Sequence, residues 1–123
     1  MREMAWLGFM GTVLLVNTGC GENCQSTCRH VYDDAECNIS KGGIQTGDLI
    51  GTCISECEDA MRIPGELGDY DPFVRVSAAE TVRLENEAQA AAWIDCVWEI
   101  APDPGYTPEC SNLEPQTGYC API

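Results

Sequence analysis

Near its N-terminal end the chain carries a group of residues spaced like one face of an α-helix. The positions follow the i, i+3, i+4, i+7 pattern, which places their side chains on a single stripe. The members of this stripe are Cys24, Thr27, Cys28 and Val31. Asn23 is a suitable N-terminal cap, and residues 33–43, which end in two glycines, have the composition of a loop. The pattern predicts a first helix at about residues 23–32.

A second stretch has the cleanest amphipathic pattern in the sequence. Its stripe consists of Ile50, Cys53, Ile54, Cys57 and Met61, with polar residues between them. Thr46 or Asp48 can cap its start, and Pro64 and Gly65 stop it. We therefore expect a second helix at about residues 48–62.

The longest uninterrupted helical pattern comes third. Ser77 and Glu80 have the spacing of a capping box, and no glycine or proline follows until after Ile100. One face of this segment carries Val82, Gln89, Trp93, Cys96, Val97 and Ile100. The pattern predicts a helix at about residues 77–100 with Trp93 in the core. Trp98 lies off the stripe, where it can form part of a contact surface.

Residues 101–123 contain repeated proline and glycine together with two cysteines. Such a segment cannot continue the helix and is expected to be irregular, held by its cysteines. The predicted fold is therefore a small all-α domain. It consists of a disulfide-stapled helical hairpin, a third helix packed on it, and a disulfide-pinned C-terminal tail.

The cysteines of the first two helices are spaced identically. Cys24 and Cys28 are one helical turn apart, as are Cys53 and Cys57, so each pair lies on one face of its helix. In an antiparallel hairpin the outer cysteines meet and the inner cysteines meet. This geometry predicts the disulfides Cys24–Cys57 and Cys28–Cys53. The spacing resembles the hairpins of the small Tim chaperones and of the plant α-hairpinin peptides, a resemblance of geometry that implies no shared function.

The remaining pairings rest on the expected path of the chain. If the third helix runs antiparallel to the second, its C-terminal turns return to the loop end of the hairpin, which brings Cys96 toward Cys37. Cys110 and Cys120 are close in sequence and bracket turn residues. We therefore expect Cys37–Cys96 and Cys110–Cys120, with a tail that the helical core does not need.

The N-terminal residues have the character of an export signal. Residues 5–16 form a mostly apolar run, too short to span a membrane comfortably, and Gly19-Cys20 follows it. This ending resembles the lipobox of bacterial lipoproteins, although that pattern favours an aliphatic residue where this chain has Asn17. The resemblance implies a signal peptide at residues 1–19 and a single mature domain at residues 20–123 that begins with a lipid-bearing Cys20. Ordinary cleavage near the same position without lipid is the alternative.

The cysteine count agrees with lipidation. The chain has nine cysteines, and setting Cys20 aside leaves eight, an even number that can form four disulfides. Such a framework is typical of exported proteins in oxidising compartments. We expect the protein at the cell envelope, on the periplasmic or surface face of a membrane, or secreted.

The net charge of −14 restricts the possible partners. A strongly negative field repels nucleic acid and anionic headgroups, so nucleic acid is not expected as a partner. Contact with a membrane is expected only through the N-terminal lipid. A basic protein is the partner that the charge favours.

The sequence offers few candidates for chemistry. His30 is the single histidine and is expected at the surface of the first helix. The two Cys-x-x-x-Cys pairs, with or without His30, can bind zinc only as reduced thiols, which an oxidising compartment disfavours. Asp69, Asp71 and Glu66 can at most form a weak calcium site. We expect no catalytic site, no metal and no cofactor.

Two functions remain open. The first is a structural or protein-interaction module at the cell envelope. The alternative is a small ligand-binding or peptide-binding protein that uses a groove between the third helix and the hairpin.

Overall fold

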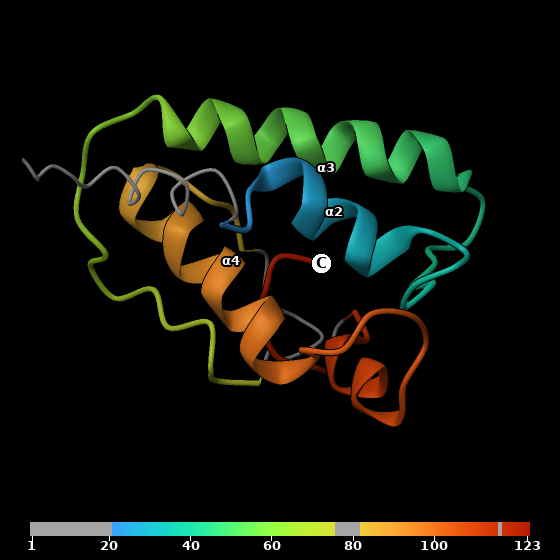
Figure 1. Ribbon diagram of the computed structural model, residues 1–123. Helices are drawn as coiled ribbons and strands as arrows, with labels where there is room; N and C mark the ends of the chain where they lie inside the picture. Colours follow the sequence, from blue (N-terminus) through green and yellow to red (C-terminus); the bar gives the residue numbers. More distant parts are fainter. Residues whose placement is uncertain (1–20, 76–81, 116) are drawn as a thin grey trace, which may run out of the picture.

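The structure is a computed structural model that describes residues 21–75, 82–115 and 117–123. Its elements are α2 (Cys24–Tyr32), α3 (Thr46–Met61), α4 (Glu87–Ile100) and a short 3-10 helix, η2 (Pro108–Leu113). There is no β-strand among these residues, and the chain folds as the predicted all-α domain with four disulfides (Figure 1). Helices α2, α3 and α4 each contact the other two.

Helix α2 begins at Cys24 with Asn23 as its cap, close to the predicted range of residues 23–32. The Asn23 side chain accepts a hydrogen bond from the backbone N–H of Ser26, and the Ser26 hydroxyl accepts one from the backbone N–H of Asn23. This reciprocal pair satisfies two N–H groups that a helix start otherwise leaves without partners. Asn23 therefore fixes where the folded domain begins, only three residues after Cys20.

Helix α3 runs antiparallel to α2, and two disulfides join the pair as expected (Figure 1). Cys24 bonds to Cys57 and Cys28 to Cys53, with Cα atoms 5.7 and 5.9 Å apart. These separations lie within the normal range for disulfides. Both predicted pairings of the hairpin are confirmed.

Helix α4 begins at Glu87, ten residues later than the sequence pattern predicts. Asn86 is extended, and its side chain accepts a hydrogen bond from the backbone N–H of Gln89, which makes it the true cap. The Gln89 side chain in turn accepts from the backbone N–H of Glu85 and holds the preceding residues outside the helix. Residues 82–86 are not helical, and the expected capping box at Ser77 and Glu80 lies outside the described residues.

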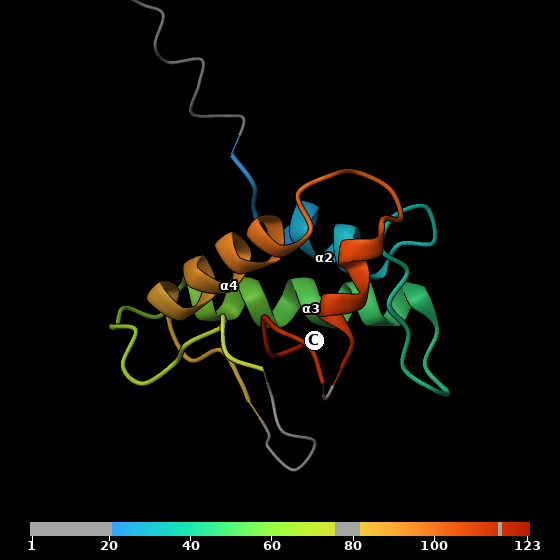
Figure 2. The same ribbon diagram turned by 90° about the horizontal axis from the view of Figure 1, so that it is seen from below.

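The C-terminal tail is part of the core. Ala101, Cys110, Leu113, Gly118 and Cys120 are buried in it. Leu113 is fully enclosed, and the indole N–H of Trp93 donates to the Cys120 carbonyl over 2.9 Å. In Figure 2 the red tail folds back toward the three helices.

The tail disulfides differ from the prediction. Cys37 bonds to Cys110 and Cys96 bonds to Cys120, so both the expected Cys37–Cys96 link and the expected Cys110–Cys120 link are wrong. The Cα separations are 5.3 and 5.6 Å. Each tail cysteine is therefore joined to a different part of the helical domain.

Helix geometry explains the correction. Helix α4 starts near the end of α3 and crosses it obliquely, and its C-terminal end does reach α2 (Figure 1). The residue that faces α2, however, is Trp98, which stacks on His30. Cys96 precedes Trp98 by two residues, a rotation of roughly 200° about the helix axis. Cys96 is therefore turned away from α2 and faces the tail, where Cys120 lies.

Candidate functional site

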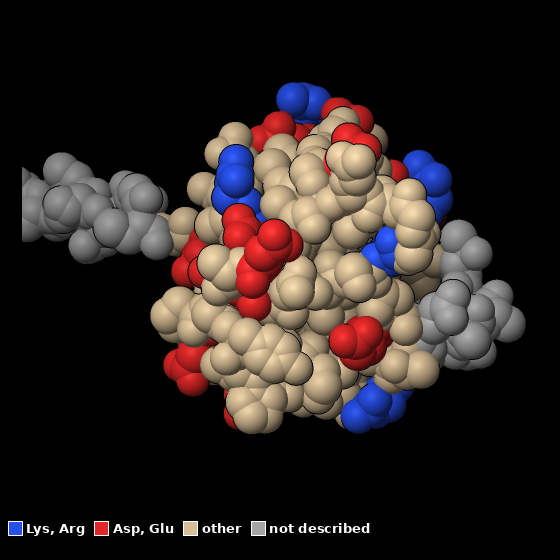
Figure 3. Space-filling model, turned by 90° about the vertical axis from the view of Figure 1, so that its right-hand side faces the viewer, with Lys and Arg blue, Asp and Glu red and all other residues tan. Residues whose placement is uncertain are grey.

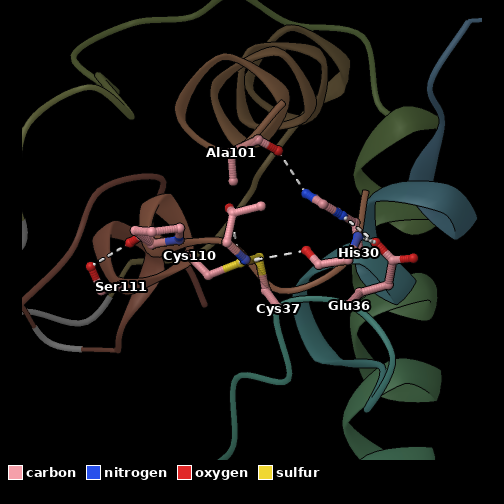
Figure 4. Close-up of a disulfide and its surroundings, with 9 residues drawn as sticks. His30, Glu36, Cys37, Ala101, Cys110 and Ser111 are labelled. Carbon is pink, nitrogen blue, oxygen red and sulfur yellow. Dashed lines mark hydrogen bonds and ion pairs between the residues drawn. A yellow bond between two sulfur atoms is a disulfide. The ribbon is translucent and has the colours of Figure 1, made fainter. Parts of the chain in front are cut away.

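His30 is at the centre of a polar cluster that joins α2, the turn after it and the segment after α4 (Figure 4). Its side chain is 1% exposed, so the expectation of a surface histidine is wrong. Nδ1 lies 2.8 Å from Glu36 Oε1, and Nε2 lies 2.7 Å from the Ala101 carbonyl oxygen. The ring stacks on Trp98 with centroids 4.1 Å apart.

His30 is buried because α2 is covered on two faces. Cys24 and Cys28 of the predicted stripe are bonded to α3, whereas Thr27 of the same stripe and His30 meet Trp98 of α4. The indole N–H of Trp98 donates to the Thr27 hydroxyl over 2.9 Å. Trp98 is therefore half-buried against α2. A second buried face is not visible in a single amphipathic stripe.

Glu36 extends the cluster to the tail. Its Oε1 also accepts the backbone N–H of Gly105 over 2.9 Å. This hydrogen bond, followed by the one with His30, lowers the pKa of the Glu36 carboxyl below its usual value. Gly105 has a φ of +81°, which glycine adopts without strain. The carboxylate thus binds the segment after α4 to the turn after α2.

The cluster is built for docking rather than for proton transfer. Both ring nitrogens lie within hydrogen-bond distance of an oxygen, Nδ1 of the Glu36 carboxylate and Nε2 of the Ala101 carbonyl. The side chain is buried, so neither nitrogen is presented to a substrate or a metal. Its role in this geometry is to hold α2, α4 and the tail together.

The cysteines are likewise structural. Cys24, Cys28, Cys53 and Cys57 are consumed in disulfides and present no thiolates, which rules out the four-cysteine zinc alternative in this state. Across the described ranges no group of three or more potential side-chain ligands is arranged to hold a metal ion, and this includes Glu66, Asp69 and Asp71. Cys20, the predicted lipidation site, lies outside those ranges.

A small cleft exists where the sequence suggests a ligand groove, between the hairpin, α4 and the chain end. Its walls include Tyr32, Leu49, Leu84, Trp93 and Ile123. The space is about 80 Å³. Pockets that enclose a small organic ligand are typically about 300–1,000 Å³, so this cleft admits a few waters or a single side-chain end.

The acidic charge is not gathered in one patch on the face of the molecule shown in Figure 3. On the face shown in Figure 3 the acidic side chains form several separate groups, with basic residues between them. No helix in the described part of the chain has the length and apolar character needed to cross a membrane.

Four disulfides in one small domain indicate an oxidising location, outside the cytosol. The sequence matches no protein-family model, and no curated protein and no solved structure is detectably similar to it. Function is therefore argued from the residues themselves.

Proposed function

We propose that this protein is an exported, lipid-anchored module for protein interaction at the cell envelope. The observation that carries the proposal is the closure of the cysteine framework. All eight cysteines within the described residues bond to one another, so none of them remains as a partner for Cys20. Cys20 is then available for the lipid that the lipobox-like leader implies.

The anchor would place the domain against the membrane. Only residues 21–23 separate Cys20 from α2, and Asn23 already caps that helix. Three residues span at most about 10 Å. A lipid on Cys20 would therefore hold the start of α2 near the headgroups, and the opposite end of the domain would face outward.

The composition of the surface supports binding rather than catalysis. The single histidine is buried with both nitrogens engaged. The net charge of −14 favours a basic protein partner and disfavours nucleic acid. The alternative is a small ligand-binding or peptide-binding protein that uses a groove between the third helix and the hairpin. The cleft beside Trp93 in that place measures about 80 Å³, which is small for an organic ligand.

Expression in a bacterial host with labelled fatty acid tests the anchor. The proposal predicts that the mature protein carries acyl mass on Cys20 and fractionates with membranes. Cys20→Ser should lose both properties while keeping its four disulfides. Asn17→Leu restores the aliphatic residue of the lipobox and serves as the matched control, with processing equal to or faster than that of the parent.

A mature N-terminus at a residue other than Cys20, or no acyl mass on the parent protein and on Asn17→Leu alike, would contradict the anchor. Membrane association that persists in Cys20→Ser would also contradict it, because the attachment would then depend on another feature.

A further inference from the structure

The segment at residues 67–73 passes beside α4 (Figure 1). Between them lies an open surface groove of about 520 Å³. Its apolar lining comes from Leu67 and Phe73 on one side and Ala92 of α4 on the other. Three carboxylates border it, those of Asp69, Asp71 and Asp95. We call this feature the acidic groove.

The apolar side chains of the groove are exposed although the backbone beneath them is held. Leu67 is 41% exposed and Phe73 is 47% exposed. The Leu67 carbonyl accepts from the Gln89 side chain over 3.3 Å, and the Tyr70 hydroxyl donates to the Ala121 carbonyl. Farther along, the Pro72 carbonyl accepts the backbone N–H of Cys120 over 2.7 Å. A surface held in this way loses little conformational entropy when a partner binds.

The carboxylates of the groove are not neutralised by neighbouring cations. The lining contains no Lys, Arg or His. Among the described residues the ion pairs are His30–Glu36 and Arg62–Asp59, neither of which involves the groove. The nearest arginine in sequence, Arg75, places its guanidinium 4.5 Å from the centre of the Tyr119 ring and donates to the Thr117 carbonyl. Arg75 and Arg83 line an adjoining pocket that shares Asp69 and Asp71, whereas Asp95 lines the groove alone. The carboxylates of the groove are therefore open to an external cation, Asp95 most of all.

We propose that the acidic groove binds an arginine side chain from a basic segment of a partner protein. This proposal rests on the proposed function of protein interaction and names the contact. An arginine combines an aliphatic stem, which suits Leu67 and Ala92, with a planar guanidinium that pairs with carboxylates and stacks on an aromatic ring such as Phe73. Lysine lacks the planar group and should bind more weakly.

Titration of the oxidised full-length protein with fluorescein-labelled hexa-arginine tests the proposal, with fluorescence anisotropy as the readout. Asp69→Asn combined with Asp95→Asn should raise the dissociation constant at least tenfold. Asp103→Asn combined with Glu109→Gln removes the same charge from exposed positions away from the groove, and it should change the constant less than twofold. Equal losses in the two double variants would overturn the proposal, because binding would then follow net charge alone.

A second pair of variants tests the aromatic contact. Phe73→Ala should weaken hexa-arginine binding at least threefold, whereas Tyr106→Ala removes a more exposed ring, 69% accessible, and should have no effect. Hexalysine that binds as tightly as hexa-arginine would overturn the assignment to arginine. Dimerisation that Phe73→Ala abolishes would overturn it in favour of a second copy of the chain.

Far-UV circular dichroism checks that each variant is folded. No step of this titration uses a membrane, so its failure leaves the lipid anchor standing. Failure of the Cys20 experiment likewise leaves the groove standing.

Discussion

Helix α3 and the C-terminal tail contribute to the fold in opposite ways. Helix α3 is a regular helix of 16 residues, yet its buried residues are only Leu49, Cys57 and Ala60. The tail has little regular structure and nevertheless buries five residues, among them Leu113 and Cys120 at 0% exposure. Regular secondary structure is therefore a poor guide to what forms the core here. Two disulfides join each region to the rest of the domain, and both regions bury a few residues; the difference is that the tail does so without regular secondary structure beyond η2.

Removal of one tail disulfide should have the largest effect. Cys37 and Cys110 are separated by 73 residues. The shortest path through the other disulfides still leaves a loop of roughly 60 residues. The chain-entropy relation gives a loss of about 4 kcal/mol for Cys37→Ala with Cys110→Ala. For Cys24→Ala with Cys57→Ala the second rung remains, so only a ring of roughly eight residues is opened, worth about 2.5 kcal/mol.

Urea unfolding of the two double variants measures both free energies. A tail variant as stable as the parent would show that the tail is an appendage, as the sequence alone suggests. A larger loss of unfolding free energy for Cys24→Ala with Cys57→Ala than for Cys37→Ala with Cys110→Ala would show that the hairpin disulfide matters more than the tail disulfide.

Truncation of packed side chains should separate the two regions next. Leu113→Ala removes a fully buried side chain of the tail and should cost about 2–5 kcal/mol in the free energy of unfolding. Ile54→Ala, at a half-buried position of α3, should cost about 1 kcal/mol. Thermal and urea denaturation measure both values. Equal losses of unfolding free energy would contradict the closer packing assigned to Leu113 of the tail than to Ile54 of α3.

Glycine replacements should have opposite signs in the two regions. Gly51 of α3 is exposed, and a Cβ there meets no atom within 4 Å, so Gly51→Ala should stabilise the protein by about 1 kcal/mol. At Gly118 a Cβ would lie 2.4 Å from the Asn112 carbonyl oxygen, so Gly118→Ala should destabilise it. Two destabilising results would indicate that α3 is covered by something in the folded protein.

Acid should weaken the attachment of the tail. The pKa of Glu36 is lowered in the folded state, so its contribution is present above the unfolded pKa and is lost as the pH falls through the folded value. The free energy of unfolding should fall as the pH drops below about 4.5, the usual pKa of this carboxyl. Glu36→Gln should remove part of this dependence. An unchanged acid limb in the variant would contradict the assigned role of Glu36.

Alkali should act on the hairpin through Tyr32, in addition to its action on Tyr70, whose pKa is also raised by burial and then by the charge of Asp71. The part due to Tyr32 should be the smallest effect. Burial, followed by the charge of Glu56, raises the pKa of Tyr32 from 10.0 to about 12. Its contribution is present below pH 10 and is lost as the pH rises toward 12, because the unfolded tyrosine ionises first. Tyr32→Phe should flatten stability between these values. A variant that keeps the full alkaline loss would show that another group is responsible.

The hairpin was predictable because helical periodicity acts over short distances. Cysteines four residues apart lie on one face, and antiparallel helices leave one consistent way to pair Cys24, Cys28, Cys53 and Cys57. The start of α4 was not predictable from helix propensity, since Asn86 and Gln89 fix it through tertiary hydrogen bonds to the segment at residues 66–67.

The path of the tail and the burial of His30 could not be predicted from the sequence, for a related reason. The path of an irregular segment depends on contacts with distant residues, such as the bond from Gly105 to Glu36. The spacing of residues along the chain does not predict those long-range contacts. The offset of two positions between Cys96 and Trp98 was the one available signal, because side chains two positions apart lie on opposite sides of a helix and only one of the two can face α2.

Eight cysteines form four disulfides that include the tail, and we propose that Cys20 is left to carry the lipid. Digestion of the membrane fraction with trypsin, chymotrypsin and a glutamyl endopeptidase, without reduction, tests it by mass spectrometry. Cleavage after Glu99, Glu109 and Leu113 separates the peptides of Cys96, Cys110 and Cys120. The account predicts Cys37 linked to Cys110, Cys96 linked to Cys120, and an acylated Cys20. A disulfide to Cys20, or Cys110 linked to Cys120, would contradict it.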